Sequence, residues 1–108
     1  MSDYPEKVWR GSSGEEYHYT VYDLESSFPV EPGNYIFASY DVVKGWIAVY
    51  IGQTHNLQER LTNHEKENCT AGNDATHIHI HINHFGEQAR LDEERELIEN
   101  YDPCCNNS

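Results

Sequence analysis

The chain has 108 residues, a formal net charge of −12 and an aromatic content of 12%. This length allows one domain with a modest core, and eight tyrosines and two tryptophans argue against a disordered chain. No apolar run approaches the roughly 18 residues of a membrane helix, and the N-terminus has no secretion signal. We therefore expect a cytoplasmic protein with no membrane partner.

The acidic charge is unevenly distributed. Residues 1–32 contain two basic and seven acidic side chains, whereas in residues 33–64 two bases balance two acids. Proteins that bind nucleic acid usually present a basic surface. The segment 33–64 is thus the part of the chain least unfavourable to a bound phosphate.

Four segments are typical of strands. Residues 17–22 are rich in β-forming side chains. Residues 34–40 and 46–51 are apolar on both faces, as central strands are, with a hairpin expected at Lys44-Gly45. Residues 76–83 alternate strictly between polar and apolar side chains, which predicts a further strand.

Two segments are typical of helices. Asn56 is a good N-cap for a helix over residues 57–67. A second helix should cover residues 87–101 and end before Pro103. The order of these elements predicts an α/β fold of the α+β type, in which helices pack against a mixed or antiparallel sheet.

The second helix places one acid among its apolar residues. On a helical projection Glu94 lies at the centre of the apolar stripe, and the other acids of the helix lie on other sides. A buried carboxylate requires a cation, an arginine or a hydrogen-bond donor. Glu94 is therefore a candidate metal ligand, with a structural ion pair or a partly exposed position as the alternatives.

Arg60 and His64 lie on the apolar face of the first predicted helix. They share it with Leu57 and Leu61 at helical spacing. Arg60 can clamp a phosphate, pair with a carboxylate or lie over the core. His64 can carry protons or have no role.

The cysteines and the strand histidines predict no metal site. Cys69, Cys104 and Cys105 form no C-x-x-C pair, and we expect reduced thiols. Three alternating histidines, at positions 77, 79 and 81, are roughly 6.5 to 7 Å apart along a strand, too far to reach one zinc ion easily. A solvated or helix-covered polar face is the expectation.

Five motifs in residues 33–106 resemble, in order, those of the GIY-YIG nuclease family. Gly33-Asn34-Tyr35 is similar to the first half of the signature, with Asn34 in place of the usual isoleucine, and Tyr50-Ile51-Gly52 matches the second half. The remaining matches lie at residues 53–61, at the E-x-x-L-I run of residues 94–98, and at the P-x-x-N of residues 103–106.

The resemblance implies a small three-stranded antiparallel sheet flanked by helices. Residues 33–108 would form the nuclease domain, and residues 1–32 an N-terminal extension that contributes a strand. The implied activity is metal-dependent hydrolysis of nucleic-acid phosphodiester bonds, with DNA as the expected substrate and RNA as the alternative.

The resemblance also implies a role for each matching residue. Glu94 would hold the cofactor, Mg²⁺ or Mn²⁺, and Arg60 would bind the scissile phosphate. Tyr35, Tyr50 and His64 would complete the catalytic set, one of them as the general base. Gly52 and Asn106 would support the site.

The net charge leaves a second function open. A catalytically weak or inactive GIY-YIG domain could act as an acidic module that contacts a protein or mimics nucleic acid. Alternatively, a protein partner could supply the affinity for DNA that this acidic chain lacks.

Overall fold

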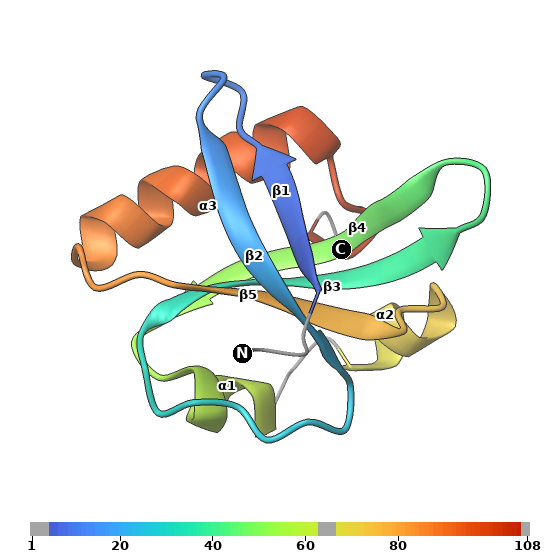
Figure 1. Cartoon of the computed structure of the whole chain (residues 1–108), viewed down its shortest axis with the longest axis horizontal. Helices are drawn as coiled ribbons and strands as arrows, with labels where there is room; N and C mark the ends of the chain where they lie inside the picture. Colours follow the sequence, from blue (N-terminus) through green and yellow to red (C-terminus); the bar gives the residue numbers. More distant parts are fainter. Residues whose placement is uncertain (1–4, 63–66, 107–108) are drawn as a thin grey trace.

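The computed structural model describes residues 5–62 and 67–106, which form one five-stranded antiparallel sheet with helices on both faces (Figure 1). The strands run in the order β1-β2-β5-β3-β4. They are β1 Glu6–Arg10, β2 Glu16–Asp23, β3 Gly33–Asp41, β4 Gly45–Thr54 and β5 His77–Ile82. The helices are α1 Leu57–Thr62, α2 Glu67–Gly72, α3 Glu87–Tyr101 and the 3₁₀ turn η1 Cys104–Asn106.

The sequence prediction of an α+β fold with an antiparallel sheet is confirmed, but the sheet is larger than expected. It has five strands instead of three, because β1 and β2 join it through the pairing of β2 with β5. β1 was not predicted from the sequence, and it is only five residues long. β4 lies at an edge of the sheet, although its apolar sequence resembles that of a central strand.

The predicted hairpin joins β3 and β4. Their pairing runs from Gly33 opposite Thr54 to Asp41 opposite Gly45, with an irregularity between Phe37 and Ala38. The Asp41 carboxylate accepts hydrogen bonds from two backbone amides of the turn, and Gly45 closes it at a φ of 83°. Such a positive φ favours glycine, so the turn follows from this local sequence.

The helices differ in how well the sequence predicted them. α3 has the predicted bounds, and its last turn closes at Asp102, whose amide donates to the carbonyl of Ile98. α1 begins as predicted and is described as far as Thr62, and α2 begins at Glu67, the last residue of the first predicted helix. No helix in the described ranges is long and apolar enough to cross a membrane.

Two clusters of buried side chains hold the helices on opposite faces of the sheet. One cluster lies on the face covered by α1 and includes Tyr35, Phe37, Leu57, Ile78 and Ile80. The other lies under α3 and includes Trp9, Tyr19, Ile36, Ile51 and Leu97. Alternate residues of β3 therefore point into different cores, as the twofold period of a strand requires.

The fully buried acid of α3 is Glu93, which corrects the prediction of a core-facing Glu94. Glu93 is 2% exposed, whereas Glu94 is half-buried. The Glu93 carboxylate accepts a hydrogen bond of 2.6 Å from the Tyr19 hydroxyl and one of 3.2 Å from the Asn83 amide. It also bonds His81 Nδ1 at 2.9 Å. The projection failed because it considered only the apolar residues of α3, whereas the sheet face under the helix also offers hydrogen-bond partners to Glu93 beside its apolar cluster.

The histidines of β5 lie on the sheet face that α3 covers. Of the two expected arrangements, a solvated or a helix-covered polar face, the structure shows the second. His79 is fully buried, and its Nδ1 accepts a 3.0 Å hydrogen bond from the indole of Trp9. Burial lowers the pKa of His79 to about 3, so the ring is neutral at physiological pH. Residues 5–62 and 67–106 contain no group of three or more His, Cys, Asp or Glu side chains arranged to hold a metal ion.

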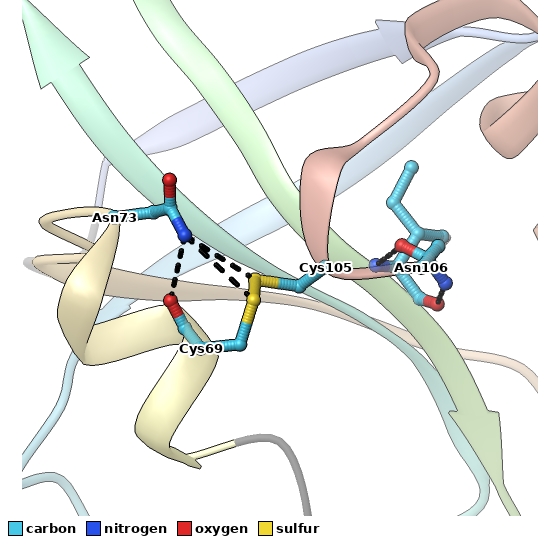
Figure 2. Close-up of a disulfide and its surroundings, with 5 residues drawn as sticks. Cys69, Asn73, Cys105 and Asn106 are labelled. Carbon is cyan, nitrogen blue, oxygen red and sulfur yellow. Dashed lines mark hydrogen bonds between the residues drawn. A yellow bond between two sulfur atoms is a disulfide. The ribbon is translucent and has the colours of Figure 1, made fainter. Parts of the chain in front are cut away.

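Cys69 and Cys105 form a disulfide, which corrects the prediction of reduced thiols. Their Cα atoms are 5.9 Å apart, and the bridge joins α2 to η1 (Figure 2). The pairing spans 36 residues, so the local spacing of the cysteines could not indicate it. Cys104 is a free, exposed thiol.

The buried position of Glu93 yields a stability prediction. We expect Glu93→Ala to lower the free energy of unfolding by roughly 3 kcal/mol, because the change removes the acceptor of three buried or partly buried donors. Glu99 lies on the exposed side of the same helix. Glu99→Ala should change stability by no more than about 0.5 kcal/mol. Urea unfolding measures both, and equal losses would contradict the structural role of Glu93.

Candidate functional site

Tyr35 of β3 lies at the centre of the candidate site. Its side chain faces α1 and is 1% exposed. The Arg60 Nε donates a 3.0 Å hydrogen bond to the Tyr35 hydroxyl, and Arg60 also bonds the side chain of Tyr50. The two tyrosine rings are 6.1 Å apart. Three of the residues predicted from the sequence therefore contact or adjoin one another.

The start of α1 explains the position of Arg60. The Asn56 side chain accepts a hydrogen bond from the Glu59 amide, which confirms the predicted N-cap. Leu57 is fully buried, and its amide donates to the carbonyl of Glu31. These contacts fix the first turn, and Arg60 follows one turn later at the edge of the core.

Gly52 leaves the space that the Tyr35 ring occupies. The two residues lie opposite each other in the β3–β4 pairing. A Cβ atom added at Gly52 would lie 2.5 Å from the Tyr35 hydroxyl oxygen and 2.5 Å from the ring carbon that bears it. Real Cβ atoms do not approach other atoms so closely, and a buried ring has little room to move. Gly52 thus has the supporting role expected of it.

Asn106 supports β4 along the edge that faces away from β3. Its Oδ1 accepts a hydrogen bond from the Ile51 amide, and its Nδ2 donates to the Ile51 carbonyl, both at 2.8 Å (Figure 2). The side chain therefore satisfies both backbone groups of Ile51 at the edge of the sheet, as a neighbouring strand would. We call these two hydrogen bonds between Asn106 and Ile51 the clamp. Because Ile51 lies between Tyr50 and Gly52, the clamp holds the backbone of the candidate site.

Glu94 reaches the site from α3. Its carboxylate accepts a hydrogen bond from the backbone amide of Gln53, next to Gly52 on β4. Burial raises the pKa of Glu94, and this hydrogen bond partly opposes the rise. The charge of Glu94 is also among the causes that raise the pKa of Tyr35. We call Tyr35, Tyr50, Arg60 and Glu94 together the Tyr35 site.

The electrostatics of the Tyr35 site favour a neutral tyrosine. Burial raises the pKa of Tyr35 above its ordinary value, and the hydrogen bond from Arg60 opposes this only in part. The same hydrogen bond raises the pKa of Arg60. The site therefore combines a fixed positive charge, a neutral hydroxyl and a half-buried carboxylate.

Two residues that the sequence analysis missed connect α3 to this site. Arg90 is 7% exposed, and its Nε donates to the side chain of Gln53 at 3.1 Å. Asn34 is fully buried and donates to the backbone carbonyl of Arg90 at 2.9 Å. Asn34 is the position at which the sequence departs from the GIY signature, and its side chain points away from Tyr35, toward α3. A polar residue within an otherwise apolar strand was the signal for this contact.

His64, which the sequence predicted as part of the catalytic set, lies outside the described residues.

A scan against models of protein families and a search of curated proteins each found no match to this chain. The resemblance to the GIY-YIG family therefore depends on the residues named above.

The arrangement can bind an anion and a cation side by side. A guanidinium binds two oxygens of a phosphate at once, and a carboxylate with bound waters is a usual environment of Mg²⁺. The hydroxyl of the partly exposed Tyr50 can hydrogen-bond to a water molecule or a substrate oxygen.

The space at Gly52 can be tested by a pair of glycine substitutions. Gly52→Ala should lower the free energy of unfolding by about 1 to 3 kcal/mol, because the new methyl group meets the Tyr35 ring. A Cβ at Gly72 in α2 would meet nothing within 4 Å, so Gly72→Ala should be neutral or slightly stabilising. Thermal unfolding compares the two variants. Equal stabilities would show that Tyr35 has space to spare.

Proposed function

We propose that this protein is a GIY-YIG-type endonuclease that hydrolyses nucleic-acid phosphodiester bonds at the Tyr35 site with one divalent metal ion. The observation that supports the proposal is the hydrogen bond of 3.0 Å between Arg60 and Tyr35. It ties a phosphate-binding group to the first half of the signature, in a site that Glu94 of α3 also reaches. DNA is the proposed substrate, with RNA as the alternative, and the cytoplasm is the proposed location.

The donor set at Glu94 fits Mg²⁺ or Mn²⁺. Its ligand atoms are carboxylate oxygens, which hard cations prefer, and Mg²⁺ commonly uses only one or two protein carboxylates beside substrate oxygens and water. Burial of Glu94 raises its pKa, so its charged form gains from a bound cation. The metal ion, when bound, would polarise a phosphoryl oxygen of the substrate.

The protein residues would bind and orient the scissile phosphate. Arg60 carries a fixed charge against the negative charge that develops on the phosphoryl oxygens. Tyr35 holds this guanidinium in place through its hydroxyl. Tyr50 is partly exposed, so its hydroxyl can contact a water molecule that the buried Tyr35 cannot easily reach. The general base is therefore Tyr50 or His64 in preference to Tyr35.

The net charge of −12 favours a second candidate function. An acidic surface repels nucleic acid and attracts basic proteins. On this alternative the chain is an interaction module or a nucleic-acid mimic, and the Tyr35 site is inactive. A nuclease with this charge would bind DNA weakly unless a protein partner supplied affinity.

A cleavage assay tests the proposed function. Purified protein at low salt with Mg²⁺ or Mn²⁺ should cut supercoiled plasmid, branched DNA or single-stranded DNA or RNA. Glu94→Gln and Arg60→Ala should each lower the rate at least about a hundredfold, because the first removes the charged ligand of the metal ion and the second removes a positive charge that stabilises the transition state. Glu87 is an exposed acid of the same helix, and Glu87→Gln should retain full activity.

The two functions predict opposite results. Cutting by the wild type and Glu87→Gln alone would establish the enzyme and its site. Full activity of folded Glu94→Gln, after removal of contaminating nuclease, would refute the site. If folded wild type neither cuts nor binds any of these substrates, the acidic interaction module is the better explanation.

A further inference from the structure

A disulfide lies directly beside the clamp that supports the Tyr35 site. It joins Cys69 of α2 to Cys105 of η1, and the next residue, Asn106, makes both hydrogen bonds to Ile51 (Figure 2). η1 is a single turn of three residues, and the described chain ends there. The cross-link is therefore the covalent constraint nearest to the clamp.

The surroundings of the two sulfur atoms differ. Cys105 is fully buried, whereas Cys69 is partly exposed. The amide nitrogen of Asn73 donates to the Cys69 carbonyl at 2.9 Å and lies 3.7 Å from each sulfur atom. A hydrogen-bond donor at this place favours a thiolate over a thiol, so it assists a reaction in which a sulfur leaves with negative charge.

We propose that the Cys69–Cys105 disulfide is a reversible redox latch that keeps Asn106 on Ile51 and so keeps the Tyr35 site in order. The oxidised form holds η1 against α2 and β4. In the reduced form the covalent tie to α2 is lost, and η1 is held on β4 only by the burial of Cys105 and the two hydrogen bonds of Asn106. The effect on cleavage depends on the proposed function, whereas the effect on Ile51 does not.

The reductant is a dithiol. One of its thiolates attacks the sulfur of Cys69, the accessible end of the bridge, and the sulfur of Cys105 leaves as a thiolate that takes up a proton. The second thiol of the reductant then attacks the mixed disulfide and releases Cys69. The protein gains two electrons and two protons in total, and the dithiol becomes a cyclic disulfide.

The redox state of the compartment determines whether the Cys69–Cys105 disulfide would switch between its oxidised and reduced forms. Cytosolic disulfides are commonly transient and sense the redox state, whereas extracellular ones persist. A cytoplasmic chain with this bridge would therefore alternate between the two forms. The bridge does not involve Cys104, which is exposed and adjacent in sequence and so offers a matched control.

Hydrogen exchange at the Ile51 amide tests the latch directly. We expect exchange to become at least about tenfold faster when wild-type protein is reduced with dithiothreitol, and equally fast in Cys69→Ser without reductant. Exchange should return to its original rate after reoxidation with oxidised glutathione. Cys104→Ser should match the wild type in both states.

Two internal checks separate a latch from general loss of stability. Amides of the β1–β2 pairing, such as Tyr19, lie far from the bridge in the sheet order and should keep their protection in the reduced protein. Alkylation must show that all three cysteines react after reduction and only one before it. Unchanged exchange at Ile51 in fully reduced protein would overturn the proposal, as would a uniform rise across the sheet.

Cleavage is the second readout. If the wild type cuts nucleic acid, reduction and Cys69→Ser should each lower the rate at least about tenfold, and Cys104→Ser should not. If no form of the protein cuts, the proposed function fails while the exchange result still decides on the latch. Redox-independent cleavage together with faster exchange would show that the clamp does not control the site.

Discussion

The structure depends on how α3 buries a carboxylate against a sheet face that combines an apolar cluster with polar side chains. The carboxyl group of Glu93 is buried, which is tolerable only because Tyr19, His81 and Asn83 surround it with hydrogen-bond partners. These partners come from β2, from β5 and from the segment after β5. One side chain thus fixes the rotation of α3 about its own axis. This rotation in turn brings Glu94, the next residue, to the edge of β4 and not to the interior.

The Tyr35 site combines side chains that approach from both faces of the sheet. Tyr35 and Arg60 belong to the face covered by α1, while Glu94 approaches from the helix on the other face. Gln53 near the end of β4 connects them, because its amide binds Glu94 and its side chain binds Arg90. Because Arg60 and Glu94 approach from different faces, the site can combine their opposite charges without burying both side chains in one hydrophobic core.

Local signals in the sequence predicted most elements, whereas the grouping of Tyr35, Tyr50, Arg60 and Glu94 into one site came from the family resemblance. Pro103 marks the end of α3, and Asn56 marks the start of α1, because each acts within a few residues of itself. The choice between Glu93 and Glu94 could not be predicted, since it depends on the polar residues of strands far away in the chain. The disulfide between Cys69 and Cys105 could not be predicted for the same reason, because it joins residues far apart in the chain. Asn34 was visible as an exception to a motif, but its partner on α3 was not.

The strand order has a consequence for the time course of folding. β5 is the last strand in the sequence, yet it lies between β2 and β3 and joins two pairs of neighbours that do not otherwise touch in the sheet. On a ribosome, β1 with β2 and β3 with β4 can each form a hairpin as they emerge, because their contacts are local. The two hairpins cannot become one sheet until residues 77–82 have been synthesised. Until then each hairpin exposes an unpaired edge, which makes this interval the period of greatest risk of aggregation.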